Sequence, residues 1–149
     1  MGSKADEWSQ AAAIPYRYRR ERLEVALINS STGKRWIVPK GTVEAGESAA
    51  ECALREAVEE AGVLGVLTDE ALGRYRYTKN AVRHRVSVFG LRVTETLERW
   101  PEDGLRTRLW VRPREALRRI EQPGLQSIVA RLLRQPDRYH SRRSLRSLS

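Results

Sequence analysis

The sequence has a single cysteine, Cys52, which excludes a disulfide bond within the chain. That usage suits a reducing compartment. No apolar run approaches the roughly 20 residues that a membrane-spanning helix needs. Residues 1–10 are polar and lack the apolar core of a signal peptide. We therefore expect a cytoplasmic protein that does not enter a membrane.

Acidic residues are outnumbered, because 19 Asp and Glu face 28 Lys and Arg, which gives a net charge of +9. Such an excess favours an anionic partner, and nucleic acid, a membrane surface and polyphosphate all fit it. Hydrophobic residues make up 40% of the 149 positions, enough for the core of one compact domain. The charges are of mixed sign, which argues against wholesale disorder.

Strand and helix patterns interleave along the chain and indicate an α/β or α+β fold. We predict a flexible lead-in over residues 1–15, one domain over residues 16–135 and a basic, flexible tail over residues 136–149 in which His140 is solvated. The expected strands cover residues 23–28, 36–38, 74–78, 85–94 and 109–111, and the expected helices cover residues 49–61, 113–120 and 125–133. Tyr75 and Tyr77 would share one strand face, where core packing and base stacking are both open.

The helix over residues 49–61 has recognisable start and stop signals. Ser48 is a good N-cap, and Glu51 three residues later completes a capping box. Gly62 is placed to end the helix. A loop with two glycines, residues 41–47, precedes it. Cys52 lies among alanines on this helix and is expected to be a small buried hydrophobe.

Three carboxylates gather on that helix. Glu56, Glu59 and Glu60 fall at i, i+3 and i+4, so they share one face. They occupy the C-terminal half, where the helix dipole is negative and each carboxylate costs roughly a few tenths of a kcal/mol. A divalent cation would offset this cost, and oxygen ligands suit Mg²⁺. The alternative is a solvated acidic face balanced by arginines.

A wider pattern surrounds these glutamates and matches the Nudix hydrolase signature. The seven matching positions are Gly41, Glu47, Arg55, Glu56, Glu59, Glu60 and Gly62, with Ala57 and Val63 at the small or apolar positions. Seven identities at fixed spacing have a chance probability on the order of 10⁻⁸ per start position at average residue usage. The chain therefore resembles Nudix hydrolases over a specific motif.

The resemblance implies a fold, a cofactor and several roles. The fold would be an α/β/α sandwich with a mixed β-sheet. Mg²⁺, or Mn²⁺ in its place, would be held by Glu56, Glu59 and Glu60, with the Gly41 carbonyl as a further ligand. Either Glu59 or Glu60 would be the catalytic base, and a base outside the motif stays open. The structural positions of the motif would be Glu47 and Arg55, which brace the loop against the helix, and Gly62.

Flanking residues resemble one branch of that family. Residues 35–39 (RWIVP), 83–85 (RHR), 88–95 (VFGLRVTE), 98–100 (ERW) and 106–110 (RTRLW) are similar in order and spacing to diphosphoinositol polyphosphate phosphohydrolases. That branch also cleaves diadenosine polyphosphates. Animal members carry a run of glycines where this chain has Lys40-Gly41-Thr42, a departure that puts the substrate in doubt. A bacterial-type dinucleoside polyphosphate hydrolase would tolerate the lysine.

Basic residues are candidates for contact with a polyphosphorylated small-molecule substrate, because several phosphates need several guanidinium or ammonium groups. Residues 71–94 contain no Asp or Glu. The family resemblance puts Arg83, His84 and Arg85 first as substrate-binding residues. The weaker candidates are Arg17, Arg19, Arg35, Lys40 and Arg106. Solvated strand arginines are the alternative for about half of these positions.

Other functions remain open. A close alternative is removal of pyrophosphate from nucleoside triphosphates or RNA 5′ ends. A different class is a non-catalytic Nudix module that binds a nucleotide or RNA, which the intact set of glutamates disfavours. The basic tail could contact nucleic acid, although a solubilising end is favoured. The sequence does not rank inositol pyrophosphates against diadenosine polyphosphates and does not give the oligomeric state.

Overall fold

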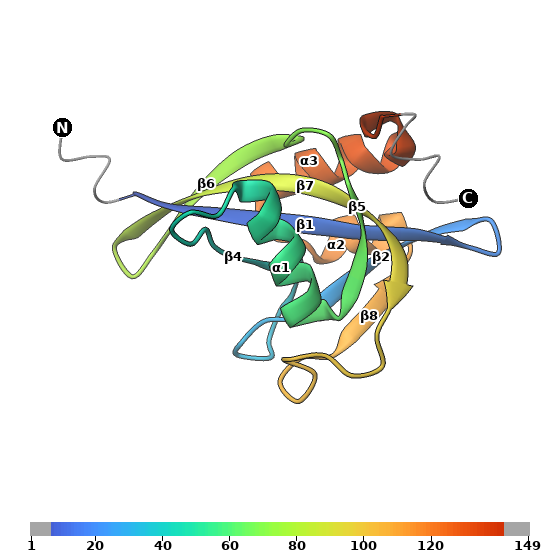
Figure 1. Cartoon of the computed structure of the whole chain (residues 1–149), viewed down its shortest axis with the longest axis horizontal. Coiled ribbons are helices and arrows are strands. Elements are labelled where there is room, and N and C mark those ends of the chain that lie inside the picture. The colour runs from blue at the N-terminus through green and yellow to red at the C-terminus, as the bar shows by residue number, and fades with distance from the viewer. Residues whose placement is uncertain (1–6, 142–149) are drawn as a thin grey trace.

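The computed structural model describes residues 7–141, which form a β-sheet with helices on both faces (Figure 1). The strands are β1 (Glu7–Arg19), β2 (Arg22–Asn29), β3 (Trp36–Ile37), β4 (Lys40–Thr42), β5 (Val63–Leu67), β6 (Gly73–Lys79), β7 (Val82–Thr96) and β8 (Arg108–Val111). The helices are α1 (Ala49–Ala61), α2 (Pro113–Arg119), α3 (Pro123–Arg134) and the short 3₁₀ helix η2 (Pro136–Tyr139). Among the described residues, no helix is long and apolar enough to cross a membrane.

The sheet is mixed. Its eight strands in the described part of the chain follow the order β3-β2-β1-β7-β5, with β4 beside β1, β6 beside β7 and β8 beside β2. The two long central strands, β1 and β7, run parallel, while the other pairs are antiparallel. In Figure 1, α1 lies in front of this sheet and α2 and α3 lie behind it. The predicted α/β/α sandwich with a mixed sheet is confirmed.

Strand β1 lies at the centre of the fold, so the predicted flexible lead-in is wrong from residue 7 onward. Its residues alternate between two buried cores. Ala11 and Ala13 face α1, while Ala12 and Ile14 face α2 and α3. Alanine has little strand propensity, and an all-apolar run has no period of two to mark a strand. Pairing with β7, β2 and β4 identifies this segment as a strand, and residues 1–6 lie outside the described range.

Helix α1 has the predicted bounds and caps. The Ser48 side chain accepts a hydrogen bond from the backbone N–H of Glu51, and the Glu51 carboxylate accepts one from the backbone of Ser48. Gly62 ends the helix in the left-handed conformation at φ 63°. The chain then enters β5 directly. This strand was not predicted from the sequence, because no turn residues mark its bounds. Lys40–Thr42 forms β4, so the N-terminal part of the predicted loop is a short strand paired with β1.

The segment from Pro136 to Ser141 packs on the sheet, which corrects the prediction that the flexible tail begins at residue 136. Asp137 accepts a hydrogen bond from the Tyr16 hydroxyl at 2.9 Å and pairs with Arg92. His140 is buried rather than solvated, with its Nε2 2.7 Å from the Tyr16 hydroxyl. Residues 142–149, which carry the rest of the predicted tail, lie outside the described range.

Candidate functional site: carboxylates beside a basic pocket

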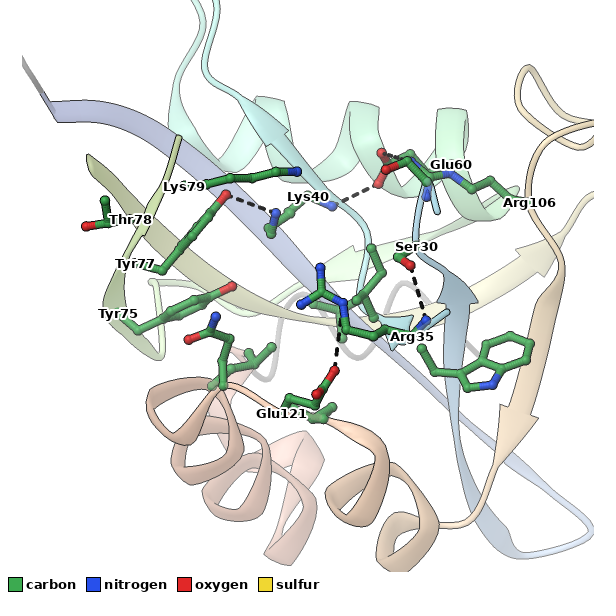
Figure 2. Close-up of a pocket in the computed structure, with 17 residues that line it drawn as sticks. Ser30, Arg35, Lys40, Glu60, Tyr75, Tyr77, Thr78, Lys79, Arg106 and Glu121 are labelled. Carbon is green, nitrogen blue, oxygen red and sulfur yellow. Dashed lines mark hydrogen bonds and ion pairs between the residues drawn. The ribbon is translucent and has the colours of Figure 1, made fainter. Parts of the chain in front are cut away.

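A cavity of about 410 Å³ opens between β3, β4 and β6 and the segment that joins α2 to α3. Basic side chains of Arg35, Lys40, Lys79 and Arg106 line it, together with Tyr75, Tyr77 and the carboxylate of Glu60. Figure 2 shows Lys40 between Tyr77 on one side and Glu60 on the other. The pocket therefore brings cations, aromatic rings and one glutamate of α1 to a common space.

Two of the three predicted metal ligands are buried. Glu56 is 8% exposed and Glu60 is 7% exposed. Burial, and then repulsion from Glu56, raise the pKa of Glu60 to about 7. Burial also raises the pKa of Glu56. Two adjacent buried carboxylates with raised pKa values indicate a place where positive charge is needed.

Two N–H groups hold Glu60 in position. Its Oε1 accepts a hydrogen bond from the backbone of Lys40 at 2.9 Å, and its Oε2 accepts one from Nη2 of Arg106 at 3.0 Å. Arg106 also donates to the carbonyl of Asn29 at 2.7 Å and to the carboxylate of Glu102 at 3.1 Å. Arg106, predicted to contact substrate, thus pairs with a glutamate of α1 at the wall of the pocket.

Arg55 connects the loop before α1 to the glutamates. Its Nε and Nη2 donate to the two carboxylate oxygens of Glu47 at 2.8 and 3.0 Å. This fork lowers the pKa of Glu47 to about 2. The Nη1 of Arg55 reaches Glu56 at 2.7 Å and Glu59 at 3.3 Å. One guanidinium thus braces the loop and bridges two of the glutamates, a geometry consistent with the predicted role of Glu47 and Arg55.

Gly41 lies against the Glu56 carboxylate. A Cβ atom added at residue 41 would stand 2.3 Å from Oε1 of Glu56 and 2.4 Å from its Cδ, far inside van der Waals contact. A side chain at residue 41 would therefore displace this carboxylate from its observed position. The observed packing thus explains the glycine in the motif and places the main chain of residue 41 beside the glutamates.

The residues present fit Mg²⁺ by donor type. The carboxylates of Glu56, Glu59 and Glu60 and the main chain of Gly41 supply hard oxygen donors without nitrogen or sulfur, as Mg²⁺ and Mn²⁺ prefer. Among residues 7–141, no three His, Cys, Asp or Glu side chains are arranged as a preformed metal site. Glu59, with 39% of its side chain exposed, points toward Arg55 instead. A cation at this place would replace the contacts that Arg55 makes with Glu56 and Glu59.

The C-terminal carbonyls of α1 accept hydrogen bonds from residues outside the Nudix motif. The last turn of α1 contains no basic residue. Nη1 of Arg108 donates to the carbonyls of Ala61 at 2.8 Å and Gly62 at 3.2 Å, and the indole of Trp100 donates to the carbonyl of Glu60 at 3.1 Å. These donors satisfy the C-terminal carbonyls of the helix. They lie 40 to 47 residues away in the sequence, so no local signal could have found them.

The predicted substrate residues fall into two groups. Arg35 and Lys40 line the pocket, as does Arg106. Arg17 pairs with Glu24 at 2.8 Å, and its guanidinium stacks 3.7 Å from the Trp110 ring centroid, away from the pocket lining. Arg19 ends β1 at an exposed hairpin. These last two arginines are not brought to the pocket.

The segment Arg83-His84-Arg85 is divided by the alternation of strand β7. The His84 ring stacks on Tyr77 with centroids 4.7 Å apart, which puts His84 on the pocket face of the sheet. Arg83 and Arg85 are exposed and, by alternation, lie on the opposite face. None of the three is among the residues that line the pocket. His84 is therefore connected to the pocket through Tyr77.

The fold and site define an α/β/α domain with a glutamate helix beside a basic pocket. Comparison with known proteins agrees with this class. The model of the NUDIX domain matches residues 8–132, so the chain belongs to the Nudix family. Nudix hydrolase 4 of Arabidopsis thaliana is 40% identical over 113 residues, which cover 69% of this chain and 54% of that protein. The chain thus spans about half the length of this relative.

Two further proteins are similar to the chain. Diphosphoinositol polyphosphate phosphohydrolase 3-beta of Bos taurus is 40% identical over 116 residues, which cover 75% of this chain and 68% of that protein. The crystal structure of a C. elegans Ap4A hydrolase binary complex superposes with a TM-score of 0.70 at 22% identity, covering 85% of this chain and 96% of the other. At this identity the structural likeness supports the fold alone.

Proposed function

We propose that the chain is a Mg²⁺-dependent hydrolase that cleaves phosphoanhydride bonds in highly anionic small molecules. The substrates proposed first are diphosphoinositol polyphosphates and diadenosine polyphosphates. The observation that carries the proposal is the buried pair Glu56 and Glu60, of which Glu60 lines a pocket that also contains Arg35, Lys40 and Lys79. Family membership and the name of the bovine relative support it.

The basic side chains of the pocket and the glutamates of α1 would have different roles in hydrolysis. Lys40, Lys79 and Arg35 would bind and orient the phosphate groups. Mg²⁺ on the glutamates would neutralise phosphate charge and lower the pKa of a bound water. Glu59 is the better placed of the two predicted bases to accept a proton. It is more exposed, and both oxygens of Glu60 already accept hydrogen bonds from Lys40 and Arg106.

Phosphate release with Mg²⁺ tests the proposal. The substrates are diphosphoinositol pentakisphosphate, diadenosine hexaphosphate, a nucleoside triphosphate and 5′-triphosphorylated RNA. We expect cleavage of the first two, and a loss of at least about 100-fold in Glu60→Gln. The matched control is Glu51→Gln on the same helix, because glutamine preserves the capping box.

Other results of this assay would favour one of the alternative functions. Cleavage of only the triphosphate or the RNA would assign the chain to pyrophosphate removal from nucleotides or RNA ends. Binding of these ligands without cleavage would favour the non-catalytic module. Equal activity of Glu60→Gln and wild type would remove the glutamates from the mechanism. The cytoplasmic location stays a prediction.

A further inference from the structure

Four aromatic side chains form a row across three neighbouring strands. Trp8 of β1 is the register partner of His84 of β7, which is in turn the partner of Tyr77 of β6. The His84 and Tyr77 rings stack at 4.7 Å and 18°, and Tyr77 stacks on Tyr75 at 6.2 Å and 28°. Trp8 meets His84 edge-on at 6.3 Å. The row begins inside the pocket, which Tyr75 and Tyr77 line.

Exposure increases along this row. Tyr75 is 7% exposed and packs against the start of α3, where a Cβ on Gly124 would stand 2.7 Å from Cβ of Tyr75. Trp8 at the other end is 52% exposed. A single exposed tryptophan is unremarkable. Trp8, however, lies next to a series of aromatic rings that extends out of the pocket. Its exposed ring surface is not covered by other side chains and is open to a planar ligand.

Lys40 connects the aromatic row to the glutamates. Its backbone N–H donates to Glu60, while its Nζ lies 3.1 Å from the Tyr77 hydroxyl and 4.9 Å from the Tyr77 ring centroid. The Tyr77 hydroxyl donates to Gln10 at 2.6 Å, which fixes the ring. The ammonium is thus held between the carboxylates and the aromatic rings, where a phosphate chain and an attached ring would meet.

The His84 imidazole remains part of an uncharged stacking surface. Burial, followed by the charges of Lys40 and Lys79, lowers its pKa, so the ring is neutral near pH 7. Both lysines therefore lie close enough to this segment to act on it electrostatically. Phosphate groups bound between Lys40 and Lys79 would lie beside the row rather than on it.

We propose that the row Trp8–His84–Tyr77–Tyr75 binds a nucleobase, which makes dinucleoside polyphosphates the preferred substrates over diphosphoinositol polyphosphates. This inference rests on the proposed function. A nucleobase has a planar π-face that stacks on aromatic side chains, and the contribution to affinity is substantial for each base. An inositol ring is saturated and gains nothing from such a surface. Trp8 is then a specificity-determining residue.

Substrate selectivity tests this assignment. We expect Trp8→Ala to lower the ratio of kcat/KM for diadenosine hexaphosphate over that for diphosphoinositol pentakisphosphate by about tenfold, mainly through KM. Trp8→Phe should recover most of the ratio, because it keeps a ring. Tyr18→Ala is the matched control, since Tyr18 is a 44% exposed aromatic residue on the same strand, outside the row, and should leave the ratio unchanged. An unchanged ratio in Trp8→Ala would overturn the inference.

A binding measurement separates this inference from the proposed hydrolysis. Diadenosine hexaphosphate is titrated into the protein in EDTA while tryptophan fluorescence is followed. The measurement is made in a Trp36→Phe background, because Trp36 also lines the pocket. We expect saturable quenching when Trp8 is present, and loss of most of its amplitude when Trp8→Phe is added. Quenching without any hydrolysis in Mg²⁺ would refute the proposed function and keep the base site. Hydrolysis with the same quenching in Trp8→Phe would keep the function and refute the base site.

Discussion

Arg106 compensates the buried charge of Glu60 together with the backbone N–H of Lys40. Arg106 and Glu60 have side chains only 12% and 10% exposed and meet at 3.0 Å. Arg106→Ala would leave Glu60 buried beside Glu56, with one backbone N–H as its remaining donor. Removing one member of a buried ion pair costs about 3–5 kcal/mol. We expect a loss near the lower value, about 3 kcal/mol, above about pH 8, where Glu60 with its pKa of about 7 is ionised.

A surface ion pair in the same segment provides the control. Arg99 pairs with Asp103 at 3.0 Å, but its side chain is 89% exposed. Arg99→Ala should therefore cost no more than about 0.5 kcal/mol. Urea unfolding in EDTA measures the two free energies of unfolding under the same conditions. The comparison holds the mutation type constant and contrasts a buried ion pair with an exposed one.

A double-mutant cycle isolates the Arg106–Glu60 interaction from the other contacts of Arg106. Arg106 also donates to the Asn29 carbonyl and to Glu102, and both contacts are lost in either background. If Glu60 is the main partner, Arg106→Ala should cost about 1–3 kcal/mol less in Glu60→Gln than in the wild type. An equal cost in the two backgrounds would show that Arg106 stabilises the segment rather than the carboxylate, and would refute the reasoning.

Three further predictions concern other parts of the structure. Gly41→Ala should keep the fold but lower activity by about 100-fold, because the added Cβ displaces the Glu56 carboxylate; circular dichroism and phosphate release check the two halves of this prediction. Burial lowers the pKa of His140, so the contribution of His140 to stability should be full above about pH 6.5 and decline as the pH falls below it. The difference in the free energy of unfolding between the wild type and His140→Gln should therefore shrink as the pH falls from 8 to 5 in urea unfolding, and this difference cancels the opposite contribution of Glu60. Arg108→Ala should destabilise the protein by about 2 kcal/mol, seen as a lower thermal midpoint, because it removes the side-chain donor of the Ala61 carbonyl at the end of α1.

The sign of the His140 effect follows from its contacts. The Tyr16 hydroxyl meets Nε2 at 2.7 Å and donates its own proton to Asp137, so Nε2 is the protonated ring nitrogen. Protonation would then fall on Nδ1, which is buried without a hydrogen-bond partner. Asp137 and Asp69 favour the charged ring and Arg92 opposes it, but burial has the largest effect. The unfolded chain therefore binds the proton more readily, and acid favours unfolding.

Capping and turn residues in the sequence predicted the elements whose bounds depend on local hydrogen bonds. The bounds of α1 follow from Ser48, Glu51 and Gly62, and the structure confirms all three caps. Strand β1 was missed because Ala11, Ala12 and Ala13 have no periodic pattern and little strand propensity. Its position depends on ten register pairs with β7, which a single sequence does not show.

The candidate site was predictable in the motif and, outside it, for the pocket-lining residues Arg35, Lys40 and Arg106. Fixed spacing on one helix placed Glu56, Glu59 and Glu60 on one face, and two of them are buried together. The donors that hold the acidic end of α1 come from the distant segment with Trp100, Arg106 and Arg108, so they depend on tertiary packing. The same limit applies to Trp8, which meets His84 only through strand pairing.

Cation-linked stability is the most direct test of the claim that the α1 glutamates hold a divalent cation. Thermal unfolding is followed with increasing Mg²⁺ after EDTA treatment, in the wild type, in Glu56→Gln and in Glu51→Gln. A ligand that binds only the folded state raises the midpoint with concentration. The account predicts a Mg²⁺-dependent rise in the wild type and in Glu51→Gln, and its loss in Glu56→Gln. The same rise in Glu56→Gln as in the wild type would contradict it.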